Sequence, residues 1–298
     1  MTSAYTWMYL LLGLAFVGLA GLSAFRRRPT VEAARDDFMR ETGAYLDPSF
    51  LAAFDARRRR SHRHHVWSLL ILGVLLLLLS GHTEFTPVVV IAPAYVLMTL
   101  PGSVERLRGA GQDFVVPGSQ GAVARPRHVV LADYVPVRSQ LLTWGSAAIV
   151  AVIGVGTFAH RHETGRAAAI ILVGSAAILG GAVFTAWFGR ALCVRPTPAV
   201  DASHLYLQDA WRAQALEQIH VENRLNAVLF TTTALGVSIN PLAFPLSIYL
   251  MLCAAAVVFG SLLLPKQHFR RRLWPTLEPG QVLLPGEPVP PRQVGATA

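Results

Sequence analysis

Residues 57–79 have the sequence RRRRSHRHHVWSLLILGVLLLLL, in which a basic cluster runs directly into an apolar block. The apolar part, residues 66–79, consists of hydrophobic side chains apart from one serine and one glycine. Such a block suits the interior of a lipid bilayer. Basic residues beside an apolar span indicate its cytoplasmic end. The stretch therefore predicts a transmembrane helix that enters the membrane from the cytoplasm.

The composition of the whole chain agrees with this interpretation. Of the 298 residues, 53% are hydrophobic and 14% are charged, whereas soluble domains carry about 25% charged residues. The hydrophobic residues are gathered in long blocks, and the charged residues lie between them. We therefore expect an all-α fold, a polytopic bundle of transmembrane helices with interfacial helices on the cytoplasmic side.

Seven apolar blocks predict about seven spans. They comprise residues 5–25, 66–79, 85–100, 141–159, 167–188, 225–239 and 242–264. The first block is a leading helix whose basic residues follow it, unlike those of a secretory signal, and the other six form three hairpins. Blocks 66–79 and 85–100 are short for a crossing of about 20 residues. A re-entrant pair there, or at the last hairpin, would leave five spans.

The basic residues predict the side of the membrane on which each loop lies. Of the 26 Lys and Arg residues, 24 lie in four segments, residues 26–65, 101–138, 189–224 and 265–298. With seven spans, all four segments fall on one side, which the positive-inside rule assigns to the cytoplasm. We expect a plasma-membrane protein with its N-terminus outside and its C-terminus inside. A re-entrant pair would remove two spans together and keep this sidedness.

The chain accordingly divides into four parts. These are a first transmembrane helix (1–25), a cytoplasmic basic segment (26–65), a bundle of three hairpins with cytoplasmic loops 101–138 and 189–224 (66–264), and a cytoplasmic tail (265–298). The tail is dense in proline and poor in apolar residues, so we expect its last 20 residues or so to be disordered.

Segment 26–65 is expected to form two helices on the membrane surface. Gly43 should end the first helix, and Pro48 stands at a favourable first position for the second. Phe50, Leu51 and Phe54 share one face of the second helix, which predicts a pose flat on the membrane.

Basic side chains of this segment are candidates for contact with anionic lipid, at roughly 1 kcal/mol per residue. They are Arg26, Arg27, Arg28, Arg57, Arg58, Arg59, Arg60 and Arg63. The net charge is +9, but no soluble segment is long enough for a nucleic-acid-binding domain. The expected partner is therefore a bilayer with anionic phospholipids, and no nucleic acid is expected.

A long helix is predicted in segment 189–224, because no Gly or Pro occurs between residues 202 and 235. Asp201 or Ser203 should cap it. Its apolar residues scatter around the helix axis instead of forming one stripe. We therefore expect it to pack between neighbouring elements.

The apolar blocks carry no ionisable side chain in their cores. Proton-coupled carriers and intramembrane hydrolases generally need such groups at depth. Glu217 and His220 have the spacing of one pair in a helical metal site, but no second pair lies in a span, so a solvated polar face is expected. Cys193 and Cys253 form no disulfide framework. We expect no catalytic residue, metal or cofactor.

Small residues within the blocks allow close contact between helices. Gly13, Gly18 and Gly21 lie in the first block, and Ala177 with Gly181 lies in the fifth. Packing within one chain is the expected use of these positions. Oligomerisation is the alternative.

Two kinds of function stay open. The first is a non-enzymatic scaffold or accessory component that binds lipid, a membrane-protein partner or a second copy through its cytoplasmic face. The second is a passive or partner-driven transporter of a small solute. Candidates for lining a polar path are Thr231, Thr232 and Thr233, while Pro93 and Pro245 are candidate helix breaks at a substrate site.

Two short stretches resemble a known group of proteins. Residues 194–199 have the sequence VRPTPA, and residues 207–212 have the sequence LQDAWR. Together they resemble a juxtamembrane segment of uncharacterised actinobacterial multi-pass membrane proteins. The resemblance implies a plasma-membrane location and no particular activity.

Overall fold

A computed structural model describes residues 2–25, 31–80, 99, 102–106, 108–110, 128–160, 165–195, 199–238, 268–278 and 281–287. Within these residues the chain is helical and forms no β-strand, so the expected all-α fold is confirmed for them. The apolar blocks 85–100 and 242–264 lie outside the described residues, with the exception of Thr99.

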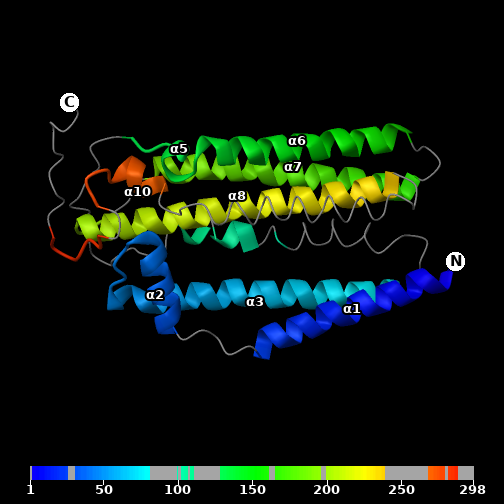
Figure 1. Ribbon diagram of the computed structural model, residues 1–298, viewed down its shortest axis with the longest axis horizontal. Helices are drawn as coiled ribbons and strands as arrows, with labels where there is room; N and C mark the ends of the chain where they lie inside the picture. The colour runs from blue at the N-terminus through cyan, green and yellow to red at the C-terminus, as the bar shows by residue number, and fades with distance from the viewer. Residues whose placement is uncertain are drawn as a thin grey trace.

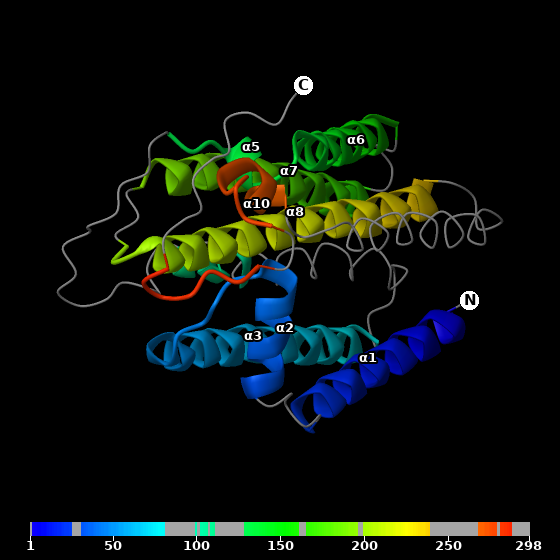
Figure 2. The ribbon, with the colours of Figure 1, turned by 60° about the vertical axis from the view of Figure 1, so that its left-hand side comes forward.

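One layer of the molecule is a pair of helices, α1 (Thr2–Phe25) and α3 (Pro48–Leu79), which lie side by side (Figures 1 and 2). They approach closely at two glycines. A Cβ atom added to Gly73 would lie 2.9 Å from the Gly13 carbonyl oxygen, and one added to Gly13 would lie 2.8 Å from Leu77 Cγ. Gly18 and Gly21 have open space beside them. Of the three glycines in this block, Gly13 is therefore the one at the contact.

The second layer is a bundle of three long helices, α6 (Val137–His160), α7 (Gly165–Val194) and α8 (Ala202–Ser238). Val150, Ile178 and Phe230 contribute to its core, one from each helix. The helix α8 lies between α6 and α7 on one side and the α1/α3 layer on the other (Figure 1). Its apolar residues from Leu205 to Val221 are buried around the whole axis, which confirms that it packs between neighbours.

Short elements gather at one end of both layers (Figures 1 and 2). They are α2 (Val31–Thr42), α5 (Leu131–Tyr134) and α10 (His268–Leu273), together with the first residues of α3 and α8. Their buried side chains form one hydrophobic core that includes Leu46, Tyr206 and Phe269. We call this unit the end domain; it comprises residues 31–54, 131–135, 199–221, 268–278 and 281–287.

The predicted limits of the two helices in segment 26–65 are confirmed at Gly43 and Pro48. Gly43 ends α2 with a φ of +71°, and α3 begins at Pro48. The expected pose on the membrane is wrong, because Phe54 is buried against Phe38 and Trp211. The second helix is also no separate element. No Gly or Pro interrupts the chain from residue 49 to 72, so α3 continues through the basic cluster into the apolar block.

The C-terminal tail is packed in a region that was expected to be disordered. Leu283 is fully buried and forms a bridge with Ala44. Arg270 is 3% exposed and donates hydrogen bonds to the carbonyl oxygens of Glu278 and Gln281, which fixes the turn that brings the tail back. The expectation of disorder is therefore wrong for residues 281–287. Residues 288–298 lie outside the described part.

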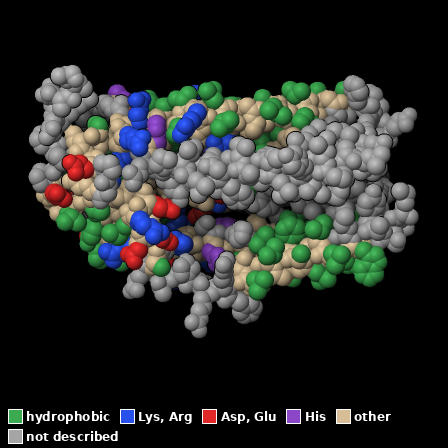
Figure 3. Space-filling view, viewed as in Figure 1, with side chains coloured by type: hydrophobic (Ala, Val, Ile, Leu, Met, Phe, Trp, Pro, Cys, Tyr) green, Lys and Arg blue, Asp and Glu red, His purple; other side chains and the backbone are tan. Residues whose placement is uncertain are grey.

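The outer faces of α1, α3, α6 and α7 expose large apolar side chains, among them Leu22, Leu78, Val152 and Val173. Figure 3 shows hydrophobic side chains along both long edges of the molecule. Among the described residues, three helical stretches are long and apolar enough to cross a membrane: Phe50–Leu79, Val137–Gly156 and Ile171–Val194. Tyr9–Ala24 is a shorter apolar helix. Exposed apolar faces of this extent indicate insertion into a membrane.

Candidate functional site

A cleft separates the two layers close to the end domain. Its walls are α3 and α8, α2 contributes at one end, and Thr99, Gly102 and Arg106 line part of it. Its volume is about 590 Å³, within the range of roughly 300–1,000 Å³ that is usual for small-molecule pockets. Figure 3 shows the hollow between the layers, with Lys, Arg, Asp, Glu and His side chains around it.

Three aromatic rings line the cleft where α2, α3 and α8 meet. Phe38 and Phe54 lie edge-on to one another with ring centroids 5.5 Å apart, and Trp211 is 5.6 Å from Phe38 and 5.4 Å from Phe54. The guanidinium of Arg57 lies 4.3 Å from the Trp211 ring centroid. This is a cation–π arrangement, and it places a positive charge over the aromatic surface.

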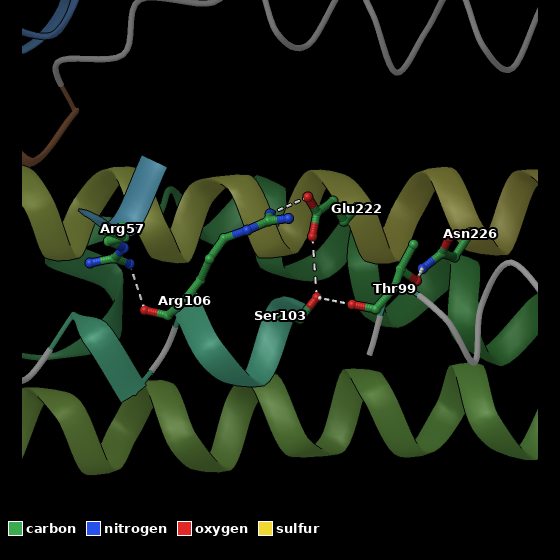
Figure 4. Close-up of polar contacts among 6 residues, drawn as sticks. All are labelled: Arg57, Thr99, Ser103, Arg106, Glu222 and Asn226. Carbon is green, nitrogen blue, oxygen red and sulfur yellow. Dashed lines mark hydrogen bonds and ion pairs between the residues drawn. The ribbon is translucent and has the colours of Figure 1, made fainter. Parts of the chain in front are cut away.

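Thr99, Ser103 and Arg106 are joined to α8 by polar contacts (Figure 4). Arg106 forms an ion pair with Glu222, and Ser103 Oγ donates a hydrogen bond to Glu222 Oε2 at 3.2 Å. One turn further along α8, Asn226 Nδ2 donates to Thr99 Oγ1 at 3.1 Å. The Arg106 and Glu222 side chains are only 19% and 22% exposed, so water screens this pair less than an exposed one.

The same residues are joined to α3. Arg57 Nη2 donates to the carbonyl oxygen of Arg106 at 2.6 Å (Figure 4), and Arg60 forms an ion pair with Glu105 at 3.1 Å. Residues 102–106 therefore connect both walls of the cleft.

The basic residues predicted to contact lipid have different positions in the structure. Arg26, Arg27 and Arg28 lie outside the described residues. Arg57 and Arg58 line the cleft, Arg59 pairs with Asp55 at 2.5 Å, Arg60 pairs with Glu105, and Arg63 is exposed. The Arg57 guanidinium thus lies over the Trp211 ring. His62 and His64 also line the cleft.

A layer of buried polar side chains joins α8 to its neighbours within the bundle. The hydrogen bonds are His220 Nδ1 with Thr143 Oγ1 at 3.0 Å, Asn223 Nδ2 to Thr185 Oγ1 at 2.9 Å and Arg224 Nη1 to Ser139 Oγ at 2.9 Å. His220 is 2% exposed, so the expectation of a solvated polar face is wrong there. The reason is that α8 enters the bundle before its apolar block begins at residue 225.

A second buried polar group lies inside the end domain. Asp209 is fully buried, and its two carboxylate oxygens accept hydrogen bonds from Tyr134 Oη at 2.8 Å and Trp274 Nε1 at 2.9 Å. Nearby, Tyr206 Oη donates to the Thr42 carbonyl oxygen at 2.7 Å. Burial raises the pKa of Tyr206 to about 12, so this hydroxyl keeps its proton and its donor role. These contacts join α8 to α2, α5 and the tail.

Asp201 caps α8, as predicted. Its Oδ1 accepts hydrogen bonds from the His204 backbone N–H at 2.7 Å and from Ser203 Oγ at 2.9 Å, and its Oδ2 accepts one from Gly286 N at 3.3 Å. Partial burial raises the pKa of the Asp201 carboxyl, but these hydrogen bonds outweigh that effect and leave the pKa below 3.8.

The structure describes only some of the other residues that were predicted to be functional. Thr231 is half-buried on α8, while the side chains of Thr232 and Thr233 lie outside the description, as do Pro93, Pro245 and Cys253. Among the described residues, no three His, Cys, Asp or Glu side chains are close enough to hold a metal ion.

The sequence interpretation missed the residues that build the cleft, chiefly Trp211, Arg106 and Glu222. The distribution of apolar residues around α8 could have indicated some of them. When apolar residues lie on all sides of a helix, polar residues between them can be buried too, as Asp209 and His220 are. The partners of these residues had no comparable signal.

No known protein family, curated protein or solved structure matches this chain. The resemblance of residues 194–212 to actinobacterial membrane proteins therefore stays a prediction. Asp209 and Trp211, which belong to that stretch, lie in the end domain and in the cleft.

Proposed function

We propose that the protein is a multi-pass plasma-membrane protein that acts as a non-enzymatic scaffold or accessory component through its end domain. In this proposal the chain crosses the membrane about seven times, with its N-terminus outside and the end domain in the cytoplasm. The observation that carries it is the end domain itself, in which chain segments separated by spans share one core. A folded platform of this kind suits binding of a protein partner.

Tryptophan positions support the placement of the membrane boundary. Trp67, Trp144 and Trp187 are 58%, 39% and 65% exposed, and tryptophan is enriched where a membrane meets water. Next to them in the sequence, Thr143 and Thr185 form hydrogen bonds with His220 and Asn223 of α8, and Leu69 lines the cleft together with Leu225 and Asn226. All three rings therefore occupy one level, next to the end domain. On this basis the end domain lies outside the hydrocarbon core.

Affinity purification from native membranes tests the accessory function. We expect a defined protein partner to accompany the full chain and to be lost when residues 281–298 are deleted, because this removes Leu283 from its contact with Ala44. Deletion of residues 288–298 alone is the matched control and should retain the partner. Full-length chain that purifies without any protein partner would contradict the proposal.

Labelling with a membrane-impermeant maleimide tests the orientation. In a background with Cys193→Ser and Cys253→Ser, Arg40→Cys should react only after the cells are permeabilised, because Arg40 is exposed on α2 of the end domain. Glu163→Cys should react in intact cells. The reverse pattern would show that the proposed sidedness is wrong.

The alternative function is a passive or partner-driven transporter of a small solute. It is favoured by the polar layer around His220, because polar side chains inside a helix bundle are often part of a solute path. This function predicts solute flux in liposomes that the triple variant Thr231→Val, Thr232→Val, Thr233→Val changes. Flux equal to that of protein-free liposomes would exclude it.

A further inference from the structure

We propose that the cleft between α3 and α8 binds the phosphate-bearing headgroup of an anionic phospholipid. The headgroup would lie beside Arg58 and His62, and the acyl chains would leave toward the bilayer beside Leu69 and Leu225. This inference rests on the membrane placement in the proposed function, and it names the ligand class of the cleft.

The charge distribution in the cleft favours an anionic group on the α3 side. Arg58 and His62 are one turn apart and both line the cleft, and the positive charge of Arg57 lies over Trp211 beside them. Protonated nitrogen donors form strong hydrogen bonds with phosphate oxygens. The α3 wall therefore provides both charge and donors for a phosphate.

Acidic side chains also line the cleft, and both Glu222 and Asp37 have cationic partners. Glu222 is paired with Arg106 and accepts a hydrogen bond from Ser103. Asp37 is paired with Arg40 at 2.7 Å. These pairs reduce the negative potential inside the cleft, which leaves the basic wall of α3 as the feature that an incoming ligand would meet.

The length and polarity of the cleft favour a lipid over a free anion. Its walls extend from Phe54 to Leu69 on α3 and from Trp211 to Asn226 on α8, which is roughly 22 Å or four helical turns. The half next to the end domain holds Arg58 and the Arg57–Trp211 pair, whereas Leu69 and Leu225 lie in the half toward the bilayer, together with the paired Glu222. Inorganic phosphate would use the first half alone. A lipid with a phosphate headgroup matches both halves.

The position of the cleft relative to the membrane boundary also suits a phospholipid. Trp67 directly precedes Ser68 and Leu69, which line the cleft, and Trp67 is exposed. If Trp67 lies at the membrane–water boundary, the basic half of the cleft is at the height of the headgroups. A lipid could then enter from the membrane without leaving its leaflet.

Lipid binding to the purified full-length chain tests the proposal. The protein is placed in phosphatidylcholine nanodiscs with or without a minor fraction of phosphatidylglycerol, and the retained lipid is identified by native mass spectrometry after release into detergent. We expect retention of phosphatidylglycerol in preference to phosphatidylcholine. Equal retention of the two lipids would overturn the proposal, and this comparison requires no variant.

Matched variants on one helix separate the cleft from general surface charge. Arg58→Gln with His62→Gln alters the cleft, while Arg59→Gln with Arg63→Gln alters neighbouring residues of the same basic run that do not line it. The first variant should lose about tenfold or more in affinity for phosphatidylglycerol, and the second should bind like the wild type. Equal losses in both would show surface attraction only, and the proposal would then be wrong.

Competition with inorganic phosphate identifies the source of the phosphate group. We expect inorganic phosphate to leave bound phosphatidylglycerol in place at concentrations that keep the ionic strength constant. Displacement of the lipid by phosphate would assign the cleft to a soluble anion and contradict a lipid site. Lipid retention and partner co-purification are separate readouts, so loss of either one identifies which of the two proposals has failed.

Discussion

Asp209 shows how single residues hold the end domain together. A buried carboxylate is unfavourable unless it is hydrogen-bonded, and here Tyr134 of α5 and Trp274 of the tail both donate to it. The three residues come from segments far apart in the sequence. One carboxylate therefore joins three segments, and its removal takes this acceptor away from two buried donors.

We expect Asp209→Ala to lower the free energy of unfolding by about 3 kcal/mol, since each buried donor that loses its acceptor costs about 1–3 kcal/mol. Tyr134→Phe removes one donor only and should cost about 1 kcal/mol. Thermal unfolding in detergent, followed by circular dichroism, measures both variants. Equal and small effects would show that the carboxylate does not join these segments.

Because Asp201 caps α8, the stability of the protein should depend on pH. Hydrogen bonds hold the pKa of Asp201 below 3.8, so the charged cap stabilises the fold above that pH and loses its contribution as the pH falls through the folded-state pKa. Asp201→Ala should cost about 1 kcal/mol near neutral pH. The difference between wild type and variant should shrink below about pH 4. A stability difference that stays constant across this pH range would show that the charge of Asp201 does not stabilise α8.

The roles of residues that act on adjacent backbone were predictable from the sequence, whereas contacts between residues far apart in the chain were not. Asp201 at the start of α8 and Gly43 at the end of α2 act on neighbouring backbone, so their roles follow from a few adjacent letters. The Arg106–Glu222 pair joins residues 116 positions apart. A charged residue seen in sequence alone gives no sign of which opposite charge it will meet across such a distance.

At the scale of elements, α8 is the central helix of the molecule. It contacts α5, α6, α7 and α10 and also forms one wall of the cleft. The absence of Gly and Pro predicted its length, and the scattered apolar positions predicted that it is buried. His220 between those positions was wrongly expected to face water, because burial of a polar side chain depends on a partner such as Thr143 on another helix.

The pair α1 and α3 should depend on its glycine contact. Gly73→Ala would bring a Cβ atom to 2.9 Å from backbone atoms of α1, so the two helices must separate, and overpacking of this kind costs about 1–3 kcal/mol. Gly18→Ala is the control, because nothing lies within 4 Å of the added atom. The midpoint of thermal unfolding should fall for the first variant and stay equal or rise for the second. If both midpoints are unchanged, the contact does not stabilise the pair.

At the scale of the whole molecule, the charge pattern predicted that the long basic segments share one side. In the structure, described residues from all four of them lie at the same end (Figure 1). The sequence interpretation treated them as surface helices, loops and a disordered tail. Their common core was not predictable, since each segment has too few apolar residues to show a core, and only together do they enclose Trp211 and Tyr206.

The central claim is that these segments form one folded domain around α8. Oxidative cross-linking in native membranes of a chain with Ala44→Cys and Leu283→Cys tests it, in a background with Cys193→Ser and Cys253→Ser. Ala44 and Leu283 are bridge partners, so we expect a rapid intramolecular disulfide. The control pair Arg40→Cys and Leu283→Cys, with Arg40 on the exposed face of α2, should react much more slowly. Equal rates for the two pairs, or no cross-link in either, would contradict the account.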